Sequence, residues 1–160
     1  QKYTMLKEIT ALRSTTEEAV DNLRKADKMV DTVLELINTN TNENETEKHK
    51  ELRKYSLTVK DSIDAHLDMV FGDDQEKQGI TREPKPTVTT YLFRPYRYLS
   101  TYIGSMDKTE QITLRQAQKA VSNAINQINT FIEEDWQSYV NEVENANLSP
   151  FNKLRKIKMD

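Results

Sequence analysis

Apolar residues recur along the first quarter of the chain at alternating steps of three and four positions. The series consists of Ile9, Leu12, Thr16, Ala19, Leu23, Ala26, Val30, Val33 and Ile37. Such steps, kept over several heptads, are typical of an amphipathic helix that packs along one seam against other helices. No Gly or Pro interrupts the series, so it predicts one helix over 3–38. The period of 3.5 residues also predicts a left-handed bundle.

Two further helices are expected in the middle of the chain. After a polar stretch rich in Asn and Thr, a second helix is predicted over 46–71 and ends at Gly72, because glycine readily takes the left-handed conformation at a helix C-terminus. A third helix is predicted over 87–103, with either Pro95 or Tyr96 on its inner face and a kink or break near Pro95. The expected inner residues are Leu52, Tyr55, Val59, Ile63, His66, Met69 and Val70, and then Val88, Leu92, Leu99 and Ile103.

A fourth helix is predicted over 107–146, opened by an N-cap at Asp107 with Glu110 three residues later. Two successive steps of four, Ile128 to Ile132 to Trp136, interrupt its heptad pattern, and such a stutter locally unwinds a supercoil. Its expected inner face is Leu114, Ala117, Val121, Ala124, Ile128, Ile132, Trp136, Tyr139 and Val143.

The predicted architecture is all-α, an antiparallel up-down-up-down four-helix bundle that forms a single domain over 1–160. The long irregular stretch over 73–86 connects the second and third helices, and Ile80 is expected to pack against the bundle. The alternative is a pair of helical hairpins splayed against another domain. The N-terminus has neither an initiator Met nor the apolar core of a signal peptide, so we expect a C-terminal fragment of a longer protein.

Composition supports long helices and narrows the possible chemistry. The 160 residues include only 3 Gly and 4 Pro, too few for the many turns of a β-sandwich or barrel. The absence of Cys excludes disulfides, zinc–thiolate sites and thiol nucleophiles. A net charge of −3 with both signs interspersed gives no basic field for nucleic acid, and no apolar run is long enough for a transmembrane segment.

Candidate catalytic and metal-binding residues are few. Di-iron bundles use Glu-x-x-His motifs, but Thr46 and Ile63 stand three residues before His49 and His66. We therefore predict no catalytic, cofactor-binding or metal-binding residue and no cofactor. His66 lies between Asp64 and Asp68, and a general base at this position is the least favoured of the functional hypotheses.

The third predicted helix carries more Tyr and Arg than one buried stripe can use. Both residue types are enriched in binding hot spots. The competing interpretation is that the tyrosines bury their rings in the core and leave their hydroxyls at its rim. A second functional hypothesis is a ligand-binding bundle, with a pocket at the aromatic end near Trp136. The candidate interaction surface consists of Phe93, Arg94, Arg97, Tyr98 and Tyr102.

The second half of the chain also resembles a known family in a diffuse set of positions. These are 78–82 (QGITR), 86–88 (PTV), Leu92, Tyr96, 98–100 (YLS), Asn126, 129–131 (NTF), 135–136 (DW), Tyr139, 143–144 (VE) and 150–151 (PF). They resemble the helical C-terminal region of bacterial sortilin-like proteins, which carry an N-terminal β-propeller with Asp-box (BNR) repeats and are often labelled glycosyl hydrolases or sialidase-like. Pro95 departs from that pattern, where a helix-compatible residue is expected.

The resemblance implies where the domain works and which part of the parent protein would be catalytic. The parent protein would be exported, so the domain would be extracytoplasmic: periplasmic, at the cell surface or secreted. No Asp-box repeat lies in these residues, so hydrolase chemistry would belong to the propeller, and a contribution to a glycoside hydrolase active site is the least favoured reading. The expected function is a non-catalytic accessory domain that packs against the propeller or a protein partner.

Overall fold

The computed structural model describes residues 2–40, 47–73, 85–101 and 108–148, and these ranges contain helices and no strands. The elements are α1 (Lys2–Asn40), α2 (Glu47–Phe71), α3 (Val88–Thr101), α4 (Lys108–Thr130), a π-helical turn η2 (Phe131–Trp136) and α5 (Gln137–Asn145). Because α4, η2 and α5 follow one another without a gap, the described chain has four helical segments. The all-α prediction is confirmed for these residues, and the predicted helix bounds agree with the observed ones to within about two residues wherever both lie in the described ranges.

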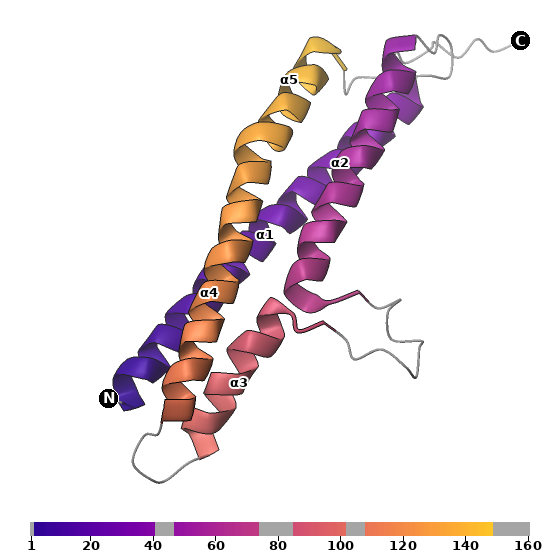
Figure 1. The fold of residues 1–160 in the computed structure, drawn as a ribbon. Helices are drawn as coiled ribbons and strands as arrows, with labels where there is room; N and C mark the ends of the chain where they lie inside the picture. The colour runs from indigo at the N-terminus through magenta and orange to yellow at the C-terminus, as the bar shows by residue number, and fades with distance from the viewer. Residues whose placement is uncertain (1, 41–46, 74–84, 102–107, 149–160) are drawn as a thin grey trace, which may run out of the picture.

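The four segments form three columns (Figure 1). We call α1 the first column, α2 followed by α3 the second, and α4–η2–α5 the third. Three successive buried clusters place α3 below α2 in the same column. One cluster contains Ile37 and Leu52, the next contains Val20, Val70 and Val88, and the third contains Ile9 and Leu99.

The predicted up-down-up-down order is therefore wrong. As the residue numbers of α1 fall from 37 to 9, those of the second column rise from 52 to 99, so α2 and α3 run in the same direction. The prediction assumed that a long connection between two helices reverses the chain. Here 74–84 separate two helices that continue along one column, and the order is up, down, down, up (Figure 1).

The heptad pattern of α1 was a reliable guide to its inner face. Eight of its nine predicted positions are buried, and Leu12 is half-buried. Leu23, Val30 and Ile37 are fully buried, and apolar surface buried in this way stabilises the fold by about 25 cal/mol per Å². Met5 and Val20 are also buried, although they lie outside the predicted series.

Helix α3 continues through Pro95, so the predicted break is absent from the described residues. An interior proline loses a backbone hydrogen bond at a cost of about 3 kcal/mol. The Pro95 ring is fully buried in line with Val88, Leu92 and Leu99, and this burial offsets part of the cost. Of the two residues considered for the inner face, Pro95 occupies it and Tyr96 is 43% exposed. A kink at Pro95 and a left-handed twist of the bundle stay predictions.

The irregularity expected in the fourth helix lies at η2. Phe131 and Tyr139 are both fully buried and are eight residues apart, one more than a heptad. A π-helical turn holds one additional residue, so it brings Tyr139 to the seam where an uninterrupted α-helix would place Ser138. Ile132 and Trp136, the predicted inner residues, are only partly buried against the same cluster.

Gly72 ends α2 as predicted, with φ of +96° and its N–H donating to the Asp68 carbonyl at 2.7 Å. Several other predicted features lie outside the described residues: the Asp107 cap, the packing of Ile80, and Ile103 on the inner face of the third helix.

Candidate functional site

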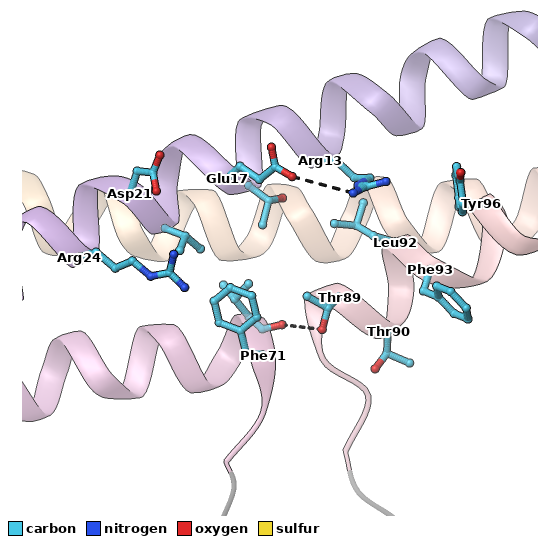
Figure 2. Close-up of a pocket in the computed structure, with 13 residues that line it drawn as sticks. Arg13, Glu17, Asp21, Arg24, Phe71, Thr89, Thr90, Leu92, Phe93 and Tyr96 are labelled. Atoms are coloured by element: carbon cyan, nitrogen blue, oxygen red, sulfur yellow. Dashed lines mark hydrogen bonds and ion pairs between the residues drawn. The ribbon is translucent and has the colours of Figure 1, made fainter.

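A groove of about 890 Å³ lies between α1 and the junction of α2 with α3 (Figure 2). We call it the α1–α3 groove. Its α1 wall consists of side chains at steps of three and four along the helix, and its other wall comes from the last residues of α2 and the first turns of α3. The lining residues are Arg13, Thr16, Glu17, Val20, Asp21, Arg24, Val70, Phe71, Thr89, Thr90, Leu92, Phe93 and Tyr96.

The floor of the groove is apolar and its edge is aromatic. Val20, Val70 and Leu92 are buried and join one core cluster. At the edge, Phe71 is 50% exposed and Phe93 is 61% exposed. Large apolar side chains gathered beside a hollow are the usual sign of a surface that binds something.

The α2–α3 junction is held by local hydrogen bonds that fix the position of the second wall. Thr87 caps α3, with its hydroxyl accepting from the Thr90 N–H at 3.2 Å. Thr89 donates its hydroxyl to the Val70 carbonyl at 3.1 Å and so ties the start of α3 to the end of α2 (Figure 2). The methyl group of Thr87 lies close to Gly72, so an added Cβ there would meet it at 3.2 Å.

Two arginines of α1 cross the groove to aromatic rings of the opposite wall. The Arg24 guanidinium lies 5.8 Å from the ring centre of Phe71, and the Arg13 guanidinium lies 5.8 Å from that of Tyr96. Between them on α1 stand Glu17 and Asp21, and Glu17 makes a long ion pair of 4.0 Å with Arg13. The α1 wall thus reads basic, acidic, acidic, basic along the groove (Figure 2).

The interaction surface predicted on the third helix lies only partly at the groove. Phe93 lines the groove, but Tyr98 is five residues further on, about 140° around the helix axis, and does not line it. Arg94 is exposed and stacks over Tyr91 at 5.8 Å, and Arg97 is exposed without lining the groove. Tyr102 lies outside the described residues. The predicted residues that the structure describes are therefore exposed, and of these Phe93 alone lines the groove.

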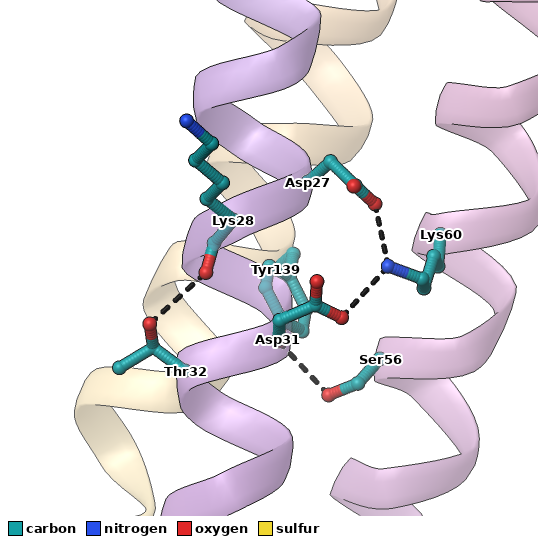
Figure 3. Close-up of polar contacts among 7 residues, drawn as sticks. All are labelled: Asp27, Lys28, Asp31, Thr32, Ser56, Lys60 and Tyr139. Atoms are coloured by element: carbon teal, nitrogen blue, oxygen red, sulfur yellow. Dashed lines mark hydrogen bonds and ion pairs between the residues drawn. The ribbon is translucent and has the colours of Figure 1, made fainter.

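Further along the same side of α1, polar residues are paired within the fold (Figure 3). The Lys60 ammonium donates to Asp27 and to Asp31, each at 2.7 Å. Hydrogen bonds to these two carboxylates raise the pKa of Lys60 well above its ordinary value. These contacts join α1 to α2 and close the space between them.

A buried hydroxyl pair joins α2 to α5 in this region. Ser56 donates to the Leu52 carbonyl at 2.8 Å, so its remaining contact, at 2.9 Å, accepts the proton of the Tyr139 hydroxyl. Burial raises the pKa of Tyr139, and the Ser56 hydrogen bond lowers it by a smaller amount. Ser56 is fully buried but was missed in the sequence, because serine in a helix is ordinarily assigned to an outer face.

His66 does not adopt the arrangement of a general base paired with a carboxylate. Its Nδ1 donates to the Ser62 carbonyl at 2.6 Å, and its ring lies against Phe131 at 5.1 Å, while Asp64 and Asp68 are exposed. In the part of the chain that the structure describes, no group of three or more His, Asp or Glu side chains could hold a metal ion.

The aromatic end holds a smaller cleft of about 440 Å³, between α2 and α5. Tyr55 lines it, and the Tyr55 ring packs edge-on against Tyr139 at 5.5 Å. Trp136 lines neither this cleft nor the α1–α3 groove, and packs on Tyr139 instead. The ligand pocket expected near Trp136 stays a prediction.

Within the described ranges, no helix has the length and apolar character needed to cross a membrane. Comparison of the chain with protein-family models, with curated proteins and with solved structures found no match. The resemblance to sortilin-like proteins therefore stays a prediction.

Sequence reasoning missed the α1 half of the groove. Arg13, Glu17, Asp21 and Arg24 have the spacing of a solvated outer face, and nothing in their own pattern distinguishes a groove wall from open surface. The one available signal was Phe71 next to Gly72, a large aromatic residue at the last position of a helix.

Proposed function

We propose that the chain is a non-catalytic helical interaction domain that binds a neighbouring domain or a protein partner through the α1–α3 groove. The observation that carries this proposal is the exposure of Phe71 and Phe93 beside an apolar floor, with Arg24 and Arg13 stacked across its two ends. Aromatic and arginine side chains around a desolvated centre are the residue types that dominate binding energy in protein interfaces.

The resemblance to sortilin-like proteins supplies the proposed context. In this proposal the domain is an accessory to an upstream Asp-box β-propeller of an exported protein, and it works in an extracytoplasmic compartment. Hydrolase activity, where the parent has any, belongs to the propeller. The side chains of the groove support this division of labour, because their charged groups are stacked or spaced along a helix rather than converging on one reacting atom.

The experiment measures binding of this chain to the remainder of its parent protein, by calorimetry with the two parts expressed separately. The double variant Phe71→Ser/Phe93→Ser should weaken binding at least ~10-fold, since hot-spot truncations typically cost 2 kcal/mol or more. Leu57→Ser is the matched control, because Leu57 is 50% exposed on α2 and does not line the groove. Equal binding by the double variant and the control would reject the groove as the interface.

A second double variant, Arg97→Ala/Tyr98→Ala, separates the groove from the surface predicted in the sequence. Both residues are exposed on α3 and lie outside the groove. If the groove is the interface, this variant should bind as the unmodified chain does. Loss of binding here, with Phe71→Ser/Phe93→Ser unaffected, would transfer the function to the other face of α3.

A further inference from the structure

Beside the three columns, the α1–α3 groove is a hollow that the described residues leave open (Figure 2). At 3.6 residues per turn, Arg13, Arg24 and Asp31 fall within about 20° of one another on α1. Asp31 is closed off by Lys60 of α2, but Arg13 and Arg24 face a space that the described chain does not fill. The same side of α1 is thus covered at one end and open at the other.

The open part has the length of a short helix. Arg13 and Arg24 are eleven residues apart, which is about 16 Å, or roughly three helical turns, along α1. Over that length the floor is Val20, Val70 and Leu92, and Phe71 and Phe93 stand at the edge. A bound helix of three turns, with apolar residues at steps of three and four, would lay an apolar stripe on this floor, as helices generally do when they bind to grooves.

The charged residues of the groove indicate which charges its occupant should carry. The α1 wall presents Arg13 and Arg24 at the ends and Glu17 and Asp21 between them. We propose that the α1–α3 groove receives an amphipathic helix of a partner, with an apolar stripe flanked by acidic residues at both ends and basic residues in the middle. This inference rests on the proposed function and adds the chemistry of the partner. Because the pattern reads alike from both ends, it sets the register of the partner helix and not its direction.

A second copy of this chain is a poor occupant of the groove. In a two-fold symmetric pair, antiparallel α1 walls would place Arg13 against Arg24 and Glu17 against Asp21. Each of these contacts joins like charges, which disfavours pairing. The charge pattern therefore selects a different sequence as the partner.

The test uses two designed peptides of about 15 residues, long enough to retain some helix in isolation. Both have the same composition and the same apolar stripe. The matched peptide carries Glu at its ends and Lys in its middle, and the exchanged peptide has these charges reversed. Fluorescence anisotropy with the whole chain should show at least ~10-fold tighter binding of the matched peptide at low salt, and a smaller preference at 1 M salt.

Two variants complete the experiment. Arg13→Glu/Arg24→Glu should remove the preference for the matched peptide, and Phe93→Ser should weaken binding of both peptides, while Leu57→Ser changes neither. Circular dichroism checks that each variant is folded. Equal affinity for the two peptides, or no binding of either, would overturn the inference. If the groove variants still weaken binding to the parent protein, the proposed function stands and only the partner chemistry is wrong.

Discussion

The two ends of one side of α1 meet the second column in different ways. At Asp27 and Asp31 the carboxylates reach the Lys60 ammonium of α2 at 2.7 Å, and the helices are closed against each other. At Arg13 and Arg24 the guanidinium groups lie over the aromatic rings of Tyr96 and Phe71 across a groove of about 890 Å³. We call these the closed end and the open end.

The difference separates charges that are paired across two helices from charges that line an open groove. The closed end combines its ion pairs with a buried hydroxyl pair, Ser56 with Tyr139, so its polar groups are satisfied inside the chain. The open end leaves Phe71 and Phe93 half or more exposed beside the groove. We therefore expect substitutions at the closed end to change stability, and substitutions at the open end to change binding.

The largest effect is expected at the closed end of the α1 seam. Val30 is fully buried, so Val30→Asp places a carboxylate where it has no partner and should destabilise the chain by roughly 3 kcal/mol or more. Urea unfolding followed by circular dichroism measures this. A free energy of unfolding near that of the unmodified chain would contradict the closed packing described for this end.

The hydroxyl pair should respond unequally to the loss of either partner. Ser56→Ala leaves the buried Tyr139 hydroxyl without an acceptor, at a cost of about 1–3 kcal/mol. Tyr139→Phe costs about 1 kcal/mol or less, because Ser56 still donates to the Leu52 carbonyl. Urea unfolding of both variants in parallel tests the order. The reverse order of the two costs would mean that the Ser56 hydroxyl donates to the Tyr139 hydroxyl.

Stability should fall at alkaline pH, through groups of the closed end. Lys60 and Tyr139 both have a folded-state pKa raised above the unfolded value, so each favours the folded state below its unfolded pKa. That contribution is lost as pH rises above about 10, where the unfolded chain loses these protons first.

Urea unfolding between pH 8 and pH 11 measures this loss. In the double variant Lys60→Met/Tyr139→Phe the fall should be shallower than in the unmodified chain. At neutral pH, Lys60→Met alone should cost about 1 kcal/mol or less, as is usual for partly exposed ion pairs. An unchanged pH profile in the double variant would place the titrating groups elsewhere.

The smallest effect on stability is expected at the open end. Phe93 is 61% exposed, so Phe93→Ser should change the free energy of unfolding by no more than about 0.5 kcal/mol. Thermal unfolding of this variant beside Leu57→Ser gives the comparison. A loss of several kcal/mol at Phe93 would show that its ring supports the core and would weaken the distinction between the two ends.

The sequence predicted the helices well because their signals are local. The seam of α1, the stop at Gly72 and the inner stripe of α4 from Leu114 to Ile128 all follow from spacing and from single-residue conformational preferences. The direction of α3 could not be predicted in this way. It depends on whether Val88 packs beside Val70 or at the far end of the bundle, and both arrangements bury the same apolar stripe.

The candidate site was harder to predict than the fold for a related reason. Phe93, named from the sequence, lines the groove, but Arg13 becomes a neighbour of the Tyr96 ring only when α3 continues the direction of α2. A groove between distant segments therefore requires the topology first. Tyr98 was grouped with Phe93 because both fall off the buried stripe of α3, and this criterion does not show which outer residues line a groove.

The π-helical turn at Phe131–Trp136 affects how this sequence should be aligned with others. A π turn is equivalent to one residue inserted into an α-helix. A relative that lacks a single residue between Ile132 and Asp135 could place both Phe131 and Tyr139 at the same seam with an unbroken α-helix. A one-residue gap at this point would therefore mark conserved packing, whereas the same gap in the middle of α4 would rotate every later inner residue away from the core.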